Sequence, residues 1–218
     1  MSTLPITDRT RLTRRPQRQV TDRAALHALL DAALVAHVAL VREGVAVVLP
    51  LACARRGDEL LLHGSTGGGL LRAAAAGATL TATVTLLDGV VYARSVSDSS
   101  MNYRSAMVVG TARVLAGDEA LQGLRALSEH LVPGRWAEVR EPTAKELAAT
   151  AVLALPLAEA SVKVRAGDPS SAPDDGEDRA VWAGVLPLTA CAGEPVPAAD
   201  VPAGVAVPAS VWERAASL

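Results

Sequence analysis

Apolar and polar positions alternate most clearly over residues 79–86, where threonines at every second position separate Leu80, Ala82, Val84 and Leu86. A period of two is typical of a β-strand that buries one face. Three apolar runs precede this strand, with short polar turns between them, at residues 35–41, 45–54 and 59–63. Such spacing predicts an antiparallel meander.

Further strands are expected in the second half of the chain. Asp88-Gly89 is a strong signal for a two-residue hairpin turn, so we expect a return strand over residues 90–94. Additional apolar runs predict strands at residues 102–115, at residues 151–165 with an interruption near Pro156, and at residues 181–188.

Helical spacing of leucines and capping residues predicts the helices. Thr21 or Asp22 can cap a helix that runs to about Ala33. A short Ala-rich helix is expected over residues 70–76, a leucine-striped helix over residues 118–130, and another helix after the capping box Thr143-Ala-Lys-Glu146. The sequence therefore predicts an α+β fold, a six-stranded antiparallel barrel with peripheral helices.

The length of 218 residues fits one domain with decorated ends. Residues 1–20 are polar and Arg-rich and are predicted to form a lead-in along the surface. Residues 21–190 would form the domain, with an acidic loop at residues 166–179. Residues 191–218 form a Pro- and Ala-rich tail of poor periodicity.

Composition limits the classes of partner. The net charge of −2 and the five aromatic residues argue against nucleic acid. One basic cluster could be a nucleic-acid arm, although a solvated lead-in is the preferred interpretation: Arg9, Arg11, Arg14, Arg15 and Arg18. No apolar run is long enough for a membrane helix, and residues 1–18 do not resemble a secretory signal, so we expect a cytoplasmic protein.

Cysteine and histidine spacing gives no metal motif. Cys53 and Cys191 form no CxxC pair, and the four histidines show no zinc-binding spacing, so no metal site is expected. Ser65 has no neighbouring His and Asp in a nucleophile-elbow context, which leaves a hydrolase unsupported.

The best candidate for binding chemistry is the segment His63-Gly64-Ser65-Thr66-Gly67-Gly68-Gly69. Its glycines permit close backbone approach, its hydroxyls can donate, and the next helix would offer unpaired N–H groups at its N-terminus. These features predict a phosphate cradle. The alternative is an ordinary Gly-rich surface turn, and the segment is not a P-loop because no Lys-Ser/Thr follows.

A second candidate is Asn102-Tyr103-Arg104-Ser105. Strand alternation places Asn102 and Arg104 on one face, and Tyr103 and Ser105 on the other. A flavin could satisfy the polar groups of the inward face. The alternative is an edge strand with exposed polar residues.

Taken in order, three segments resemble the FMN-binding proteins related to pyridoxamine 5′-phosphate oxidase, a group that includes nitroimidazole-resistance proteins. The segments are Leu-Leu-His-Gly-Ser-Thr-Gly at residues 61–67, the stretch VTLLDGVVYARSVSDSSMNYRSAMVVG at residues 84–110, and VWAGVLPL at residues 181–188. The resemblance covers roughly residues 10–190.

The resemblance implies a split-barrel homodimer with FMN at its interface. The second strand would line the flavin ring through backbone groups of Val48, Leu49, Pro50 and Leu51. The phosphate would lie against His63, Gly64, Ser65, Thr66, Gly68 and Gly69. Ser105 and Arg104 would lie near the ring.

Two departures from the family pattern alter these expectations. Relatives often carry Arg or Lys where this chain has Gly67-Gly68-Gly69, so the phosphate charge would rest on backbone N–H groups, with Arg72 as a further candidate. Relatives also often carry a His-His pair where this chain has Ser97-Asp98-Ser99-Ser100.

The resulting hypothesis is an FMN-dependent oxidoreductase that acts on an unidentified small molecule. One alternative is a haem-binding split barrel with His37 or His63 as axial ligand. Another is a flavin carrier or sensor without catalytic activity.

Overall fold

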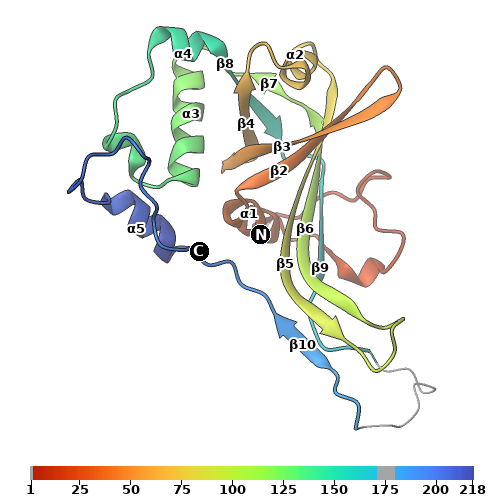
Figure 1. Ribbon diagram of the computed structural model, residues 1–218. Helices are drawn as coiled ribbons and strands as arrows, with labels where there is room; N and C mark the ends of the chain where they lie inside the picture. The colour runs from red at the N-terminus through yellow and green to blue at the C-terminus, as the bar shows by residue number, and fades with distance from the viewer. Residues whose placement is uncertain (1, 171–179) are drawn as a thin grey trace.

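The computed structural model describes residues 2–170 and 180–218. In this part of the chain, one antiparallel sheet follows the order β1-β9-β6-β5-β2-β3-β4-β8-β7, and β10 pairs with β5 (Figure 1). The long strands are β2 (Val35–Arg42), β3 (Val45–Arg56), β4 (Glu59–Ser65), β5 (Thr79–Tyr92), β6 (Ser100–Thr111), β8 (Thr150–Pro156) and β9 (Ala160–Arg165). The short ones are β1 (Gln19–Val20), β7 (Arg113–Val114) and β10 (Gly184–Pro187).

The predicted antiparallel α+β architecture is confirmed, but the expected number of six strands is wrong, because the described sheet has ten. The sheet curls so that its ends approach each other. β7 follows β6 after only Ala112 and pairs with β8, which lies at the far end of the strand order. The enclosed core consists of Leu, Val and Ala side chains, such as Leu60, Leu80 and Leu155, each fully buried.

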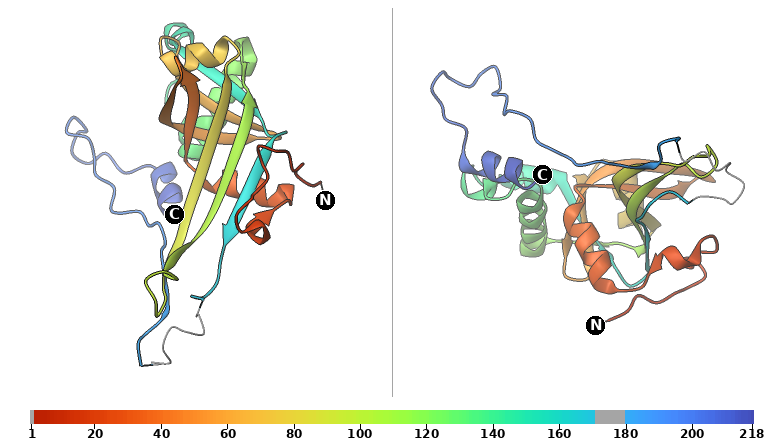
Figure 2. Two further views of the ribbon diagram at one scale, coloured as in Figure 1. Left: turned by 90° about the vertical axis from the view of Figure 1, so that its right-hand side faces the viewer. Right: turned by 90° about the horizontal axis from the view of Figure 1, so that it is seen from below.

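Within the described residues, five α-helices and two short 3₁₀ turns surround the sheet. They are α1 (Arg23–Ala32), α2 (Gly69–Ala75), α3 (Gly117–Leu131), α4 (Ala144–Ala149), α5 (Ala209–Ala216), η1 (Pro16–Arg18) and η2 (Arg135–Ala137). α1 inserts Leu26, Leu29 and Leu30 into the barrel core. α3 packs Leu127 against a second cluster that includes Leu61 and Val152. Figure 2 shows α3 and α5 on one side of the molecule and the long strands on the other.

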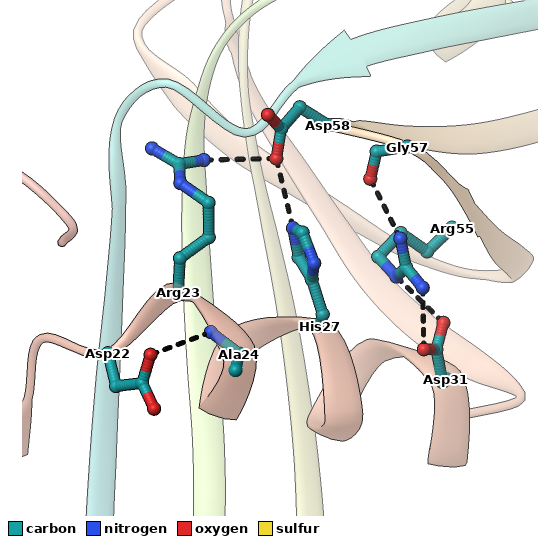
Figure 3. A network of polar contacts seen from close by, with 8 residues as sticks. All are labelled: Asp22, Arg23, Ala24, His27, Asp31, Arg55, Gly57 and Asp58. Carbon is teal, nitrogen blue, oxygen red and sulfur yellow. Dashed lines mark hydrogen bonds and ion pairs between the residues drawn. The ribbon is translucent and has the colours of Figure 1, made fainter. Parts of the chain in front are cut away.

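The predicted caps of α1 and α4 are confirmed. The Asp22 carboxylate accepts a hydrogen bond from the backbone N–H of Ala24, and Thr143 and Glu146 form the reciprocal capping box. Ion pairs fasten α1 to the turn between β3 and β4. Figure 3 shows Arg23 and His27 converging on Asp58, and Arg55 binding Asp31.

The hairpin predicted at Asp88-Gly89 is wrong, because β5 continues through these residues to Tyr92. The register against β6 shifts between Leu87 and Gly89, so Asp88 forms a bulge instead of a turn. Gly89 is buried beneath β10: an added Cβ would lie 2.9 Å from the carbonyl oxygen of Leu186. A glycine in a strand can therefore mark close approach of another backbone instead of a reversal.

Both termini are more structured than their composition predicted. Leu4 joins the core, Thr7 and Arg9 bind Glu159, and β1 pairs with β9. At the other end α5 packs beside η2, where the Ser210 hydroxyl donates to Glu138. The predicted acidic loop lies partly outside the described residues. Within them, no helix is both long and apolar enough to cross a membrane.

Candidate functional site

The outer face of the barrel carries one row of cross-strand partners that links most of the candidate site. Pro50, His37, Thr83 and Met107 are successive partners on β3, β2, β5 and β6. Opposed residues of antiparallel strands project to the same face. The alternating residues of β2, such as Ala36 and Val38, are buried in the core. His37 is consequently exposed beside the hydroxyl-bearing face of β5.

The first half of β3 is an edge strand. β2 pairs with β3 from Val45 to Ala52, whereas β4 pairs with β3 only from Cys53 to Arg56. The four residues predicted to line a flavin ring lie on this edge. Val48 and Pro50 project to the His37 face, and Leu49 and Leu51 project to the other. All four residues lie where β3 pairs with β2 on one side and with no strand of the described chain on the other.

The Gly-rich loop is ordered largely by its own hydrogen bonds. The Ser65 hydroxyl accepts from the N–H of Gly67 at 3.2 Å, and the Ser65 carbonyl accepts from the N–H of Gly68 at 2.9 Å. Thr66 donates both its N–H and its hydroxyl to the carbonyl of Ala149. Several donors that the sequence assigned to a phosphate are thus engaged within the protein. Gly64 gives space to Leu71, whose Cδ2 would lie 2.9 Å from an added Cβ.

The cation beside this loop is Arg42, which the sequence did not single out. An added Cβ at Gly69 would lie 3.3 Å from the Arg42 Nη1 atom. Arg42 ends β2, and the β2–β3 hairpin carries it to the start of α2. Arg72, the predicted source of the charge, is exposed on α2. The sequence feature that could have pointed to Arg42 is its position immediately before the Glu43-Gly44 turn.

The four histidines divide into two pairs. The His27 ring binds Asp58, and the His130 Nε2 atom lies 2.8 Å from the carbonyl oxygen of Ala33. Neither ring nitrogen of His37 has a hydrogen-bond partner in the described chain, and His63 Nδ1 is buried without one. Burial lowers the pKa of His63 from its usual 6.5, which favours the neutral imidazole. His37 and His63 are therefore the two imidazoles available to a ligand.

The structure separates Arg104 from the other candidates. Its guanidinium makes a two-pronged ion pair with Asp88, at 2.7 and 3.0 Å, and this pairing raises its pKa. Ser105 faces the opposite way, into a groove of about 370 Å³ between the N-terminal segment and strands β5, β6 and β9. Ser105 therefore shares the outer face with His37, while Arg104 and the Gly-rich loop do not.

Among the described residues, no group of three or more His, Cys, Asp or Glu side chains could hold a metal ion. Cys53 is buried, and burial raises its pKa to about 11. The site thus offers an apolar strand edge, hydroxyls, two uncommitted imidazoles and cations, which suit an organic cofactor.

Comparison with known proteins gives consistent matches. The family model described as pyridoxamine 5′-phosphate oxidase matches residues 22–164. A solved FAD and haem binding protein from Mycobacterium smegmatis is 48% identical, with a TM-score of 0.86, and the match covers 90% of this chain and 96% of that one. The flavocytochrome Anf3 from Azotobacter vinelandii is 36% identical, with a TM-score of 0.88, and the match covers 95% of this chain and 96% of that one.

A more distant match supports the fold alone. A protein from Bacteroides thetaiotaomicron, described as a 5-nitroimidazole antibiotic resistance protein, is 19% identical with a TM-score of 0.55. That match covers 67% of this chain and 86% of that one. No curated protein matches the chain. The two matches above 30% identity extend well beyond the family model, which leaves out residues 1–21 and 165–218.

Proposed function

The chain belongs to the pyridoxamine 5′-phosphate oxidase family, and from this premise we propose that it is a redox protein that binds a flavin and a haem. The observation that carries the proposal is the 48% identity, over 90% of the chain, to a protein described as binding both FAD and haem. The similarity to a flavocytochrome over 95% of the chain points the same way. FAD accordingly replaces FMN as the first candidate for the flavin.

We place the flavin ring against the unpaired edge of β3. The amides and carbonyls of Val48, Leu49, Pro50 and Leu51 at such an edge can satisfy the polar rim of a planar ring, except that Pro50 has no N–H. Exposed apolar side chains on the same strand would cover its faces; Val48 is 53% and Leu49 42% exposed.

We place the flavin phosphate at the Gly-rich loop, His63 to Gly69. The fit rests on Arg42, whose Nη1 atom lies 3.3 Å from where a Cβ at Gly69 would be. The Arg42 guanidinium offers a fork of donors to phosphate oxygens. Its described carboxylate partner, Glu43, is 3.8 Å away and exposed, so this pair competes weakly.

We assign His37 as the first candidate for haem ligation and His63 as the second. An axial histidine needs a ring nitrogen free of other partners and an accessible apolar surface for the macrocycle. His37 meets both needs, because it is exposed on the outer face with Val35, 47% exposed, on the same strand. When bound, flavin supplies two-electron and haem one-electron chemistry, while the protein supplies binding and orientation.

A homodimer is part of the proposal. Large apolar side chains remain exposed along the β2–β3 hairpin: Val35, Val41, Val45, Val48 and Leu49. These side chains lie on both faces of the hairpin, and exposed apolar side chains gathered on one element mark an interaction site. A two-fold pair of hairpins would cover it and enclose a cofactor held at the β3 edge. Light scattering should report twice the 22.4 kDa chain mass.

The deciding experiment is the absorption spectrum of the purified protein, before and after reconstitution with FAD and haem. We expect flavin bands and a haem Soret band together. Replacing the axial histidine should shift or abolish the Soret band and leave the flavin bands in place. His37→Ala and His63→Ala identify that histidine, and His27→Gln, which changes only the surface pair with Asp58, is the control. A protein with neither set of bands after reconstitution would overturn the proposal.

A further inference from the structure

We propose that a second, basic pocket binds the phosphate groups of a nucleotide-like ligand. It lies where the N-terminal segment crosses the ends of β6 and β9, and has a volume of about 220 Å³. Its lining is polar: Arg14, Arg15, Arg18, Ser97, Asp98, Ser99, Ser100, Lys163, Arg165 and Ser170. We call it the basic pocket.

Charge in the basic pocket is unbalanced. Among the described residues, the pocket lining places five cations around one carboxylate, Asp98, which already accepts a hydrogen bond from the Ser95 hydroxyl. Several arginines elsewhere pair with a carboxylate, as Arg23 does with Asp58 and Arg55 with Asp31. By contrast, four cations of the pocket have no carboxylate partner among the described residues: Arg14, Arg15, Arg18 and Lys163. Gathering unpaired cations is unfavourable unless an anion compensates for them.

Arg165 shows that the pocket is built and not a chance gathering of surface chains. It is only 9% exposed, and its guanidinium donates to Asn102 Oδ1 and to the carbonyls of Gly167 and Asp168. All three acceptors are neutral, so they fix the guanidinium without cancelling its charge. A buried cation held in this way is prepared for an anion that arrives from outside.

The backbone carries the three N-terminal arginines to this place. Gln19 pairs with Lys163 across β1 and β9, and its side chain bridges Leu12 and the carbonyl of Thr10. Arg15 adopts the left-handed conformation, at φ 57°, immediately before Pro16. That conformation is costly for a residue other than glycine and persists only where the surroundings enforce it.

The size of the pocket indicates that it takes one end of a longer ligand. Its 220 Å³ is below the roughly 300–1,000 Å³ typical of whole-ligand sites. Lys163 also lines the adjoining groove, whose hydroxyls come from Thr83, Thr85, Ser105 and Ser161. The groove reaches Thr83, the cross-strand partner of His37. A ligand with its phosphates in the pocket would therefore extend along the groove toward the proposed cofactor face.

Phosphate is the anion that best suits these donors. Arginine forks bind phosphate oxygens in pairs. Ser97 and Ser100 add hydroxyls, whereas the Ser99 hydroxyl already donates to the carbonyl oxygen of Ser95. The pocket is not the proposed flavin-phosphate site, because the Gly-rich loop lies near the Thr79 end of β5, and the pocket near the opposite end. The phosphates could belong to a separate substrate or, if FAD binds as proposed above, to the adenosine diphosphate half of that cofactor.

The test is calorimetric titration with inorganic pyrophosphate and with ADP, on the full-length protein as purified and after FAD loading. The double variant Arg14→Ser/Arg18→Ser should weaken binding about tenfold or more. Asp98→Asn should tighten it, because the carboxylate is removed. Arg125→Ser/Lys145→Ser removes two exposed cations that have no described partner, and should leave binding unchanged.

The result also identifies the source of the phosphate. If the double variant weakens FAD but not FMN, the pocket holds the cofactor's own adenosine diphosphate. If it weakens ADP binding to FAD-loaded protein and spares FAD, the ligand is separate. Absence of pyrophosphate and ADP binding together with equal FAD affinity in the double variant and wild type would overturn the proposal. If the protein binds pyrophosphate but retains neither flavin nor haem, the proposal for the basic pocket is supported and the proposed function is wrong.

Discussion

Arg42 lies directly beside residue 69: a Cβ at Gly69 would lie 3.3 Å from the Arg42 Nη1 atom. Because residue 69 has no side chain, the Arg42 guanidinium at the end of β2 can approach the Gly-rich loop. Arg42→Gln should therefore weaken flavin binding about tenfold, the loss of one charge-assisted contact. Arg72→Gln, on the exposed side of α2, should change it much less. Fluorescence titration of the apo-protein with FAD and FMN measures the affinity of both variants. Equal losses of affinity would show that Arg72 contributes as much to flavin binding as Arg42.

The loop itself can be probed at Ser65. Its hydroxyl shapes the loop by accepting the Gly67 N–H, and in the proposed site it would donate to the flavin phosphate. Ser65→Ala should weaken flavin binding by about ten- to a hundredfold. Gly68→Asp should do more, since its Cβ would lie 3.1 Å from the Ser65 carbonyl oxygen and its carboxylate would repel the phosphate. If neither variant alters the titration, the phosphate lies elsewhere.

Gly89 should tolerate no side chain. An alanine Cβ there would meet the Leu186 carbonyl oxygen at 2.9 Å and Val185 Cγ1 at 3.0 Å, so β10 would have to shift away from β5. Gly89→Ala should cost about 1–3 kcal/mol of stability in urea unfolding, as other overpacked sites do. The control is Gly193→Ala, where nothing lies within 4 Å of the added atom. The tilted contact between Tyr92 and Trp182 should loosen too, which tryptophan emission would report.

Stability should fall as the solution becomes acidic through His63. Burial lowers the pKa of this imidazole below 6.5 in the folded protein. Below that pH the unfolded chain takes up a proton that the folded chain resists, so the free energy of unfolding decreases as pH falls from about 6.5 toward the folded pKa. Melting temperatures measured between pH 7.5 and 5 should show this decrease in the apo-protein. His63→Gln should reduce the slope, and an unchanged slope would mean that other groups cause it.

The two cysteines should react very differently. Cys191 is exposed, whereas Cys53 is 2% exposed and has a pKa raised to about 11 by burial. Only the thiolate reacts, so at pH 8 Cys53 is protected both by burial and by its protonation state. A chromogenic disulfide reagent should titrate one thiol per chain rapidly and the second only in denaturant. Cys191→Ser should abolish the fast phase; two fast thiols in the wild type would show that the barrel opens at Cys53.

Local patterns predicted the regular part of the fold well. The short turns at Glu43-Gly44 and Gly57-Asp58 separate strands β2, β3 and β4, and the alternation over residues 79–86 lies in β5, as the sequence predicts. These predictions succeed because turns and alternation depend on neighbouring residues alone. The Asp88-Gly89 signal failed because the reason for the glycine lies on β10, almost a hundred positions away. α5 was missed for a similar reason, since its short helix is held by the contact between Ser210 and Glu138.

The candidate site divides in the same way. The β3 edge and the Gly-rich loop could be proposed from the sequence because each belongs to one continuous segment. Arg42 could not, because its position beside Gly69 exists only after the β2–β3 hairpin has formed. The family resemblance placed Arg104 near the flavin ring, and it gives no sign of the ion pair that Arg104 makes with Asp88, in a bulge on the adjacent strand.

The attachment of the N-terminal segment to Glu159 has a consequence for how the protein is made. Thr7 and Arg9 reach that residue across about 150 positions of sequence, and β1 pairs with a strand that is translated just as late. Residues 4–20 leave the ribosome long before β9 and remain without this partner until β9 has been made. At that stage the arginines at positions 14, 15 and 18 have no Lys163 or Arg165 beside them. The basic pocket is therefore assembled only after β9 has been translated.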